Sequence, residues 1–440
     1  MGQLTVSQTA STPPNTLTRF LPISMRYGHF RYYWLALLAG VTGHQMLLNF
    51  TMGWLMFDLT GQERDLAFLG IAISIPALAL NLFGGVLADR LEPKYLVAAS
   101  QSVSATVVVV LAALVLTGWV EMAHVLIAAV LIGAVQAFDQ PSRSSIFPRL
   151  VLREHIVNAV AMESLVWNGV RVLGPTLAGV IIAQRSIQES MFISAATFYI
   201  LGAVVSLLRL RDRQPATGQV AQQIKEGFRY VRSHSVFSLI MLLTFCNSLF
   251  GMAYIHLMPS FAKEVMHLEA DRVGFMLGAS GLGAIIGTIT IAKLKDHHPK
   301  GLIIVGGAIA YGVALILFSL AALWGIYEMA MAMLLVVGIS NSLYLTGGLS
   351  VLQHLVPDRL RGRVMGMYGM TWSLSPLGMA QAGFVAQYTN AAVAVAAGAV
   401  VIIIVAVLIL IYARDIRTLR GNIPESQRLA CQGVPVPVGG

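Results

Sequence analysis

Charged residues are scarce in this sequence. Only 11% of its 440 residues are Asp, Glu, Lys or Arg, whereas 57% are hydrophobic. Soluble domains carry about 25% charged residues, so a soluble fold of this composition would lack the polar surface that keeps it in solution. The apolar residues also come in blocks of about 20, the length that a helix needs to cross about 30 Å of hydrocarbon. The composition therefore predicts an integral membrane protein whose surroundings are a lipid bilayer.

Other features are missing as well. The chain has only two cysteines, Cys246 in an apolar run and Cys431 near the end, so neither a disulfide nor a metal site is expected. No Gly-Lys-Ser/Thr phosphate-binding loop, metal-spaced His/Cys/Asp cluster or Ser-His-Asp arrangement occurs. These absences argue against an ATP-driven pump and against an enzyme, and they predict no cofactor. Residues Met1–Arg19 lack the apolar core of a cleavable signal peptide and are typical of a disordered arm.

Long apolar runs predict an all-α membrane protein with twelve transmembrane helices. The predicted spans are Tyr32–Phe57, Leu66–Ala88, Tyr95–Thr117, Met122–Phe138, Val157–Ala183, Met191–Leu208, Val236–Pro259, Val273–Leu294, Gly301–Leu323, Tyr327–Leu352, Val364–Gln387 and Ala391–Tyr412.

The spans group into two six-helix bundles of one chain, which we expect to be a monomer. Polar segments divide it into a disordered cytoplasmic arm (1–25), a first bundle (26–208), a cytoplasmic linker (209–235), a second bundle (236–415) and a disordered tail (416–440).

The net charge of +9 raises the question of a nucleic-acid partner. With the amino terminus placed in the cytoplasm, however, 24 of the 29 Lys and Arg residues fall in inner segments. The outer segments hold only Arg64, Arg185, Lys263 and Arg272, and Arg171 lies within a span. This asymmetry is typical of a multi-pass protein of the cell membrane with both termini inside. It explains the net charge without nucleic acid.

The two halves contain a loose internal repeat. Gly174 and Gly179 of the fifth span match Gly378 and Gly383 of the eleventh at an offset of 204 residues. In transporters built from parallel six-helix repeats, the substrate path lies between the repeats.

The loop after the second span reads Gly85-Val-Leu-Ala-Asp89-Arg90-Leu-Glu-Pro-Lys94. It resembles the G-x-L-A-D-R-x-x-x-K loop of the major facilitator superfamily. That resemblance implies a conformational latch, in which Asp89 pairs with charges and helix ends of its own bundle. A solvated inner loop is the alternative. The latch residues we expect are Gly85, Asp89, Arg90, Lys94 and Arg143.

The stretch from Phe138 to Gly179 is similar to the branch of that superfamily that contains the enterobactin exporter and macrolide-efflux-type proteins. This resemblance implies export driven by proton antiport. The sequence departs from the pattern in two places: Glu163 stands where relatives often have Asn, and the fourth span lacks the Arg of many drug:proton antiporters. The usual proton-coupling arrangement therefore cannot be carried over.

Ionisable groups are costly in hydrocarbon, so each one suggests a function. Arg171 falls near the middle of the fifth span, on one helical face with Glu163, Trp167, Asn168 and Gly174. This face predicts a cavity in which Trp167, Asn168 and Arg171 bind substrate. The alternative is a structural ion pair between Arg171 and Glu163 or Asp139.

Proton coupling needs groups that exchange a proton near neutral pH. A carboxyl group removed from water does so more readily than an exposed one. Asp139 and Glu163 are therefore the candidate proton sites, with Arg171 as the cation that tunes them.

Polar residues also interrupt the first span. His44, Gln45 and Asn49 lie near its mid-depth, and Gln45 and Asn49 share a face by their i, i+4 spacing. We expect this patch to line the cavity. His44 is a candidate for titration, although a simple hydrogen-bonding role is the more common one for such a histidine.

These observations predict a proton-coupled exporter of small amphiphilic molecules such as drugs, siderophores or metabolites. The alternatives are an importer, uniporter or lipid flippase on the same fold, or a membrane receptor that transports nothing.

Overall fold

The computed structural model describes residues 22–210, 228–293, 299–372 and 374–417. The side chains of 81–90, 153, 157, 168, 354, 358, 359, 361–363, 370, 372, 414 and 415 lie outside this description. Every regular element of the described residues is a helix, which confirms the predicted all-α fold. Most of the predicted arm, linker and tail falls outside the described residues.

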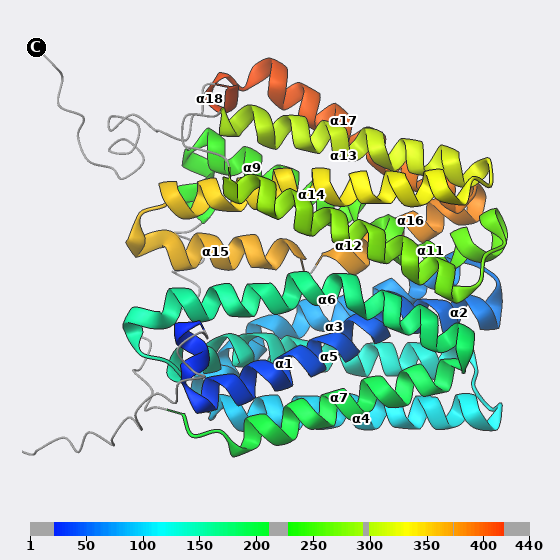
Figure 1. Ribbon diagram of the computed structural model, residues 1–440, viewed down its shortest axis with the longest axis horizontal. Helices are drawn as coiled ribbons and strands as arrows, with labels where there is room; N and C mark the ends of the chain where they lie inside the picture. The colour runs from blue at the N-terminus through cyan, green and yellow to red at the C-terminus, as the bar shows by residue number, and fades with distance from the viewer. Residues whose placement is uncertain (1–21, 211–227, 294–298, 373, 418–440) are drawn as a thin grey trace, which may run out of the picture.

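The first half of the chain forms a bundle of long helices (Figure 1). Its elements are η2 (Ile23–Arg26), α1 (Gly28–Met46), η3 (Leu47–Thr51), α2 (Met52–Thr60), α3 (Glu63–Arg90), α4 (Pro93–Thr117), α5 (Met122–Ile146), η4 (Phe147–Arg149), η5 (Arg153–His155), α6 (Ile156–Gln184) and α7 (Ile187–Leu207).

The second half forms a similar bundle that lies alongside the first (Figure 1). Its elements are α9 (Ser235–Cys246), η6 (Asn247–Gly251), α10 (Ala253–His256), α11 (Met258–Ser260), η7 (Phe261–Met266), α12 (Ala270–Lys293), α13 (Lys300–Leu323), α14 (Tyr327–Leu355), α15 (Asp358–Trp372), α16 (Ser375–Tyr388), α17 (Ala391–Tyr412) and α18 (Arg414–Arg417).

Nine helical stretches of the described residues are long and apolar enough to cross a membrane. The remaining predicted spans fall on α1–η3–α2, on α3 and on α15–α16. The first of these carries the polar patch, the second ends in side chains outside the description, and the third is divided into separate helices. The number twelve therefore stays a prediction.

One predicted boundary was wrong. The fourth span was expected to end at Phe138, but α5 continues to Ile146 with Pro141 inside it. The polar sequence from Asp139 to Ser145 resembled a loop because its side chains are hydrophilic. These side chains are instead satisfied within the bundle.

Local sequence sets several helix ends at the turns between spans. Gly61, Gly118 and Gly325 have φ of +62°, +74° and +69°, the left-handed conformation that closes a helix and that glycine adopts without strain. At helix starts, the Ser186 hydroxyl accepts the Glu189 N–H at 3.2 Å, and Asn390 caps α17 in the same way.

Small residues allow close packing along two sides of α12. Gly274 and Gly278 face Pro175 and Thr176 of α6 in the other half, and Thr176 donates a hydrogen bond to the Gly274 carbonyl at 3.0 Å. On another side, Gly283 meets the backbone of α14 at Leu335. Both contacts lie within one chain, so helices of the same chain cover these glycines.

The packing follows the internal repeat predicted from sequence. Gly174 packs against Gln45 in the first span, and Gly378 packs against Leu249 in the equivalent position of the second half. Each of these spans also contains a π-helical turn, η3 (Leu47–Thr51) and η6 (Asn247–Gly251). Such turns widen a helix locally and are frequent at functional sites.

The two halves contact each other through α6 with α12, α3 with α16, α2 with α11, and η3 with α10. Gly179 meets Ala270, Gly383 meets Glu63, and Gly53 meets Pro259. These contacts lie at the end of the bundle where α3 and α12 begin, on the right of Figure 1. We call this the closed end. The opposite end, where α1 begins and α17 finishes, is called the open end.

We predict that the α12–α14 contact is a large part of the stability of the second half. A side chain at Gly283 would overlap the Leu335 carbonyl, so Gly283→Leu should lower the free energy of unfolding by about 1–3 kcal/mol. Gly306→Leu is the matched control, because Gly306 is exposed on α13 with nothing near it. Thermal unfolding of the detergent-solubilised protein measures both. Equal melting temperatures for the two variants would contradict the prediction.

Candidate functional site

A cavity of about 410 Å³ lies between the two halves. Its walls combine polar side chains with apolar ones from both bundles. They are His44, Gln45, Leu48, Asn49, Ile73, Ser74, Ala77, Gln136, Ala137, Gln140, Trp167 and Arg171 from the first half, and Met252, Ile255, His256, Gly369, Ser375, Pro376 and Met379 from the second. The volume is within the usual range for small-molecule sites.

The first span supplies the polar patch of this cavity. Asn49, in the π-helical turn, donates a hydrogen bond from Nδ2 to the Gln45 side-chain oxygen. His44 lies one residue before Gln45, and its ring makes an edge-on contact with Trp167 of α6 at 6.1 Å between centroids. The structure thus brings together the three predicted residues of the first span, from α1 and η3, and one of the predicted residues of α6.

Arg171 lines the same cavity from the middle of α6. It is half-buried and lies within electrostatic range of the phenol groups of Tyr254, Tyr311 and Tyr368, all from the second half. One turn further along α6, Gly174 allows the helix to approach Gln45 closely. Arg171 therefore presents a positive charge toward the opposite bundle. The side chain of Asn168, predicted on the same face, lies outside the described residues.

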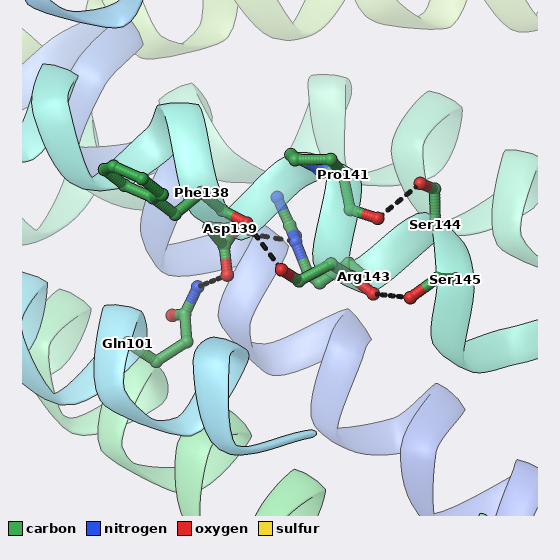
Figure 2. Close-up of polar contacts among 8 residues, drawn as sticks. Gln101, Phe138, Asp139, Pro141, Arg143, Ser144 and Ser145 are labelled. Carbon is green, nitrogen blue, oxygen red and sulfur yellow. Dashed lines mark hydrogen bonds and ion pairs between the residues drawn. The ribbon is translucent and has the colours of Figure 1, made fainter. Parts of the chain in front are cut away.

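A buried ion pair lies behind the cavity wall, inside the first half (Figure 2). Arg143 Nε is 2.7 Å from Asp139 Oδ2, with its N–H direction away from a straight hydrogen bond, and Gln101 Nε2 donates to Asp139 Oδ1 at 3.0 Å. Asp139 is 4% exposed and Arg143 is 9% exposed. Because both charges are removed from water, each depends on the other for its stability.

Serine hydroxyls complete the polar stretch around Pro141. Ser142 donates to the Phe138 carbonyl at 2.7 Å, Ser144 to Pro141 at 2.8 Å and Ser145 to Ser142 at 2.8 Å (Figure 2). These hydroxyls bond to carbonyls one turn back along the helix. They explain how the hydrophilic sequence continues as a helix.

The buried pair connects to the cavity through aromatic rings. The Arg143 guanidinium lies 5.4 Å from the centre of the Trp167 ring, and Trp167 lines the cavity. His44 touches both regions, since it also lines a small pocket of about 20 Å³ beside Asp139 and Arg143. A change of charge at the buried pair therefore changes the electrostatic potential at the cavity wall.

Glu163 belongs to this cluster rather than to Arg171. Its carboxyl group interacts electrostatically with Arg143, and the buried Tyr33 hydroxyl lies within range of Glu163, Asp139 and Arg143. The sequence suggested a structural pair between Arg171 and Asp139 or Glu163. In the described residues Asp139 pairs with Arg143, Glu163 interacts electrostatically with Arg143, and Arg171 lines the cavity.

The predicted latch lies at the open end. Gly85, Asp89 and Arg90 belong to the last turns of α3, but the side chains of 81–90 lie outside the described residues. Lys94 Nζ donates to the Leu208 carbonyl at 3.4 Å and lies 4.9 Å from the Tyr95 ring centre. Next to it, Glu92 pairs with Arg149 at 3.3 Å. Arg143, the remaining latch candidate, lies in the buried pair.

Sequence reasoning missed several cavity residues. Gln136 and Gln140 line the cavity one helical turn apart on α5. Their i, i+4 spacing in an otherwise apolar helix was a signal that could have identified them. Ser74 and the residues from α15 and α16 had no comparable signal, because only the packing of the two halves brings them to this place.

The fold is that of a multi-pass membrane transporter, in which two helical bundles enclose a central cavity. The chain belongs to the transmembrane secretion effector family of the major facilitator superfamily, whose model matches residues 18–432. This family consists of membrane transporters, so the chain is a transporter and not an enzyme, as the sequence predicted.

Individual proteins agree with this assignment. The multidrug efflux pump Tap of Mycolicibacterium fortuitum is 25% identical over 80% of this chain and 87% of its own length. An enterobactin exporter of Escherichia coli is 24% identical over 68% of this chain and 71% of its own. The solved structure of a bacterial homologue of the lysosomal transporter Spinster, in an inward-facing and unoccupied conformation, matches with a TM-score of 0.67 and 14% identity over 93% of this chain and 99% of its own.

We predict that Asp139 and Arg143 are energetically coupled. Arg143→Ala leaves a buried carboxylate without its cation and should cost about 3–5 kcal/mol of unfolding free energy. The double variant Asp139→Ala/Arg143→Ala removes both charges and should be more stable than Arg143→Ala alone. Thermal unfolding of the wild type, both single variants and the double variant gives the coupling. Additive effects of the two single changes would contradict it.

Proposed function

We propose that this protein is a proton-coupled exporter of small amphiphilic molecules that works by alternating access. The observation that carries the proposal is the cavity between the halves, which borders a buried cluster of two carboxyl groups and one arginine through Trp167 and His44. Substrate and proton would thus occupy neighbouring sites in the first half, and charge changes in one would reach the other.

The substrate class follows from the cavity walls. Leu48, Ile73, Met252, Ile255 and Met379 offer adaptable apolar surface, and methionine side chains suit ligands of varied shape. His44, Gln45, Asn49, Trp167, Asn168 and Arg171 are the proposed polar and aromatic binding residues. Arg171 would attract an anionic or electron-rich group on the substrate. The names of the multidrug pump and the enterobactin exporter agree with such a substrate.

The proposed proton sites are Asp139 and Glu163, which share the positive charge of Arg143. One cation cannot neutralise two buried carboxylates, so the uptake of one proton would balance the cluster. Arg143 would then hold the carboxylate that remains ionised. In this proposal Arg143 of α5 is the basic partner and would take over the role of the arginine that the fourth span lacks. The positive charge of Arg171, on the cavity side, would also influence how readily Asp139 and Glu163 bind a proton.

Alternating access requires the two halves to rock about their contacts. The contacts of α6 with α12 and of α3 with α16 lie at the closed end, so the described conformation would admit substrate from the open end. The loop with Gly85, Asp89, Arg90 and Lys94 lies at the open end, where it would latch the alternative conformation.

We assign the open end to the cytoplasm. Lys94, Arg149, Lys300 and Arg417 lie on elements that begin or finish there, in accordance with the positive-inside rule. Both termini are then cytoplasmic, and the protein is placed in the plasma or inner membrane as a monomer. Substrate would enter the cavity from the cell interior or the inner leaflet, as export requires.

Proton coupling can be tested in proteoliposomes with an imposed pH gradient and an amphiphilic dye as probe. A gradient with more protons on the closed-end side should drive dye toward that side, and a protonophore should abolish the movement. Dye movement that is indifferent to the gradient would contradict antiport. Movement only in the reverse direction would favour an importer, and none with any of a panel of probes would favour a receptor.

Arg171→Ala should remove most of the transport activity while leaving folding intact. Loss of a charge-assisted contact worth about 1.5–3 kcal/mol lowers the transport rate about 10- to 100-fold. Arg185→Ala is the matched control, because Arg185 is an exposed residue at the end of the same helix. Dye efflux and size-exclusion profiles should be measured together. Wild-type efflux by a well-folded Arg171→Ala protein would remove Arg171 from the binding site.

A further inference from the structure

Two glutamates from different halves of the chain meet at the closed end. Glu63 is the first residue of α3, and Glu264 lies in η7 of the second half. Ser260, one turn before Glu264, donates its hydroxyl across the seam to Glu63 Oε1 at 3.0 Å, and at this point the two carboxyl groups interact with each other. Sequence analysis gave no role to Glu63, because nothing in the sequence relates it to a residue about 200 positions further along.

Glu63 lies in an unusual environment for a carboxyl group. Its side chain is buried, with 7% exposed, and the Ser260 hydroxyl donates to Glu63 Oε1 at 3.0 Å. Among the described residues, no Lys, Arg or His side chain forms an ion pair with it. Its position at the start of α3 favours one negative charge, because the amino end of a helix is partly positive. That position does not offset a second negative charge nearby.

The nearby cations have other partners. Lys263, the residue before Glu264, pairs with Asp58 of α2 and lies 5.3 Å from the centre of the Trp54 ring. Arg64 lies 3.7 Å from its neighbour Asp65, and its backbone N–H donates to Gln387 of α16 at 3.2 Å. The two glutamates therefore face each other without a balancing positive charge.

A hydrogen bond between two carboxyl groups requires a proton, because an ionised carboxylate only accepts. Two carboxylates in contact repel each other strongly when both are ionised. The contact between Glu63 and Glu264 is therefore favourable when the pair holds one proton and unfavourable when it holds none. Glu264 is exposed to solvent, so the proton has a direct route to and from water.

We propose that Glu63 and Glu264 form a proton-binding site that joins the two halves at the closed end. The shared proton stabilises the closed conformation of this end, and its release favours separation of the halves. The site is distinct from the buried cluster around Arg143, which lies inside the first half. It deepens the proposed function, on which it rests, by adding a proton site that controls the seam itself.

The direction of the effect fits export. On the outer side of a membrane, a high proton concentration would protonate the pair, close this end and return the empty transporter to the conformation that loads from the cell. A low proton concentration would leave both groups ionised and favour opening. The pair thus links proton entry to the return step, whereas the buried cluster lies beside the substrate.

Other titratable and charged groups surround the pair and must be separated from it in a test. They are Asp58, Arg64, Asp65, His256, Lys263 and His267. Glutamine in place of one glutamate isolates the pair, because its amide group donates a hydrogen bond to the remaining carboxylate without a proton.

The opening of the closed end can be measured by pulsed electron spin resonance between two spin labels. Trp119 and Trp324 are suitable sites, since each is exposed, in the loop after α4 and at the end of α13, one on each half. Labels at Trp119→Cys and Trp324→Cys, with Cys246 and Cys431 replaced by alanine, report the distance in reconstituted protein between about pH 5 and pH 9.

The wild type should show a short distance at low pH and a growing population at longer distance as the pH rises. Glu63→Gln and Glu264→Gln should each retain the short distance across the range, or move the midpoint up by more than about one pH unit. Glu189→Gln is the control, because Glu189 is exposed at the same end and outside the seam. It should follow the wild-type profile.

A wild-type distance that does not change with pH would overturn the proposal, as would glutamine variants that keep the wild-type profile. Because Glu264 is exposed, its variant should fold even if the buried Glu63→Gln variant does not.

Dye transport by the same samples separates this inference from the proposed function. A pH-dependent distance without gradient-driven transport would leave the seam site standing and contradict the antiporter. Gradient-driven transport with a pH-independent distance would support the antiporter and overturn the proton site at the seam.

Discussion

Water is absent from the middle of a membrane, and polar groups placed there must find partners within the protein. Backbone amides find them most readily in helices, which is why every regular element of the described residues is a helix. Polar side chains find them only between helices. The protein therefore concentrates its few buried charges and amides in places where helices meet: the cavity wall, the pair around Arg143 and the seam at Glu63. We propose that these same places bind substrate, bind protons or move during transport.

Close backbone contacts join the two halves at a seam, about which we propose that they pivot. Gly179 against Ala270 and Gly383 against Glu63 are equivalent contacts of the two repeats, one on each side of the molecule. Without side chains at these glycines, α6 and α12 approach closely, as do α3 and α16. The seam at the closed end contains both these contacts and the two glutamates, so the proton site that we propose there lies where the halves would separate.

The helical fold could be predicted from sequence because apolar runs of about 20 residues match the thickness of a lipid bilayer. Sequence reasoning also predicted that Gln45, Asn49 and Arg171 lie on a cavity, since polar residues with helical spacing in apolar spans have few other uses. It failed where hydrophilicity was ambiguous: the stretch after Phe138 resembled a loop but is a helix with a buried ion pair. It offered an ion pair between Arg171 and Asp139 or Glu163 as an alternative, and the structure pairs Asp139 with Arg143. The contact between Glu63 and Glu264 depends on how two bundles pack, which no local pattern records.

The central claim is that one cavity between the halves opens at the end assigned to the cytoplasm. Gln140 lines this cavity and is exposed to it, so its accessibility reports the claim directly. Gln140→Cys, with Cys246 and Cys431 replaced by alanine, should be placed in membrane vesicles of both orientations and treated with a thiol reagent that does not cross membranes. The account predicts labelling from the cytoplasmic side, slowed by a transported amphiphile. Labelling from the outer side alone, or from neither side, would contradict it.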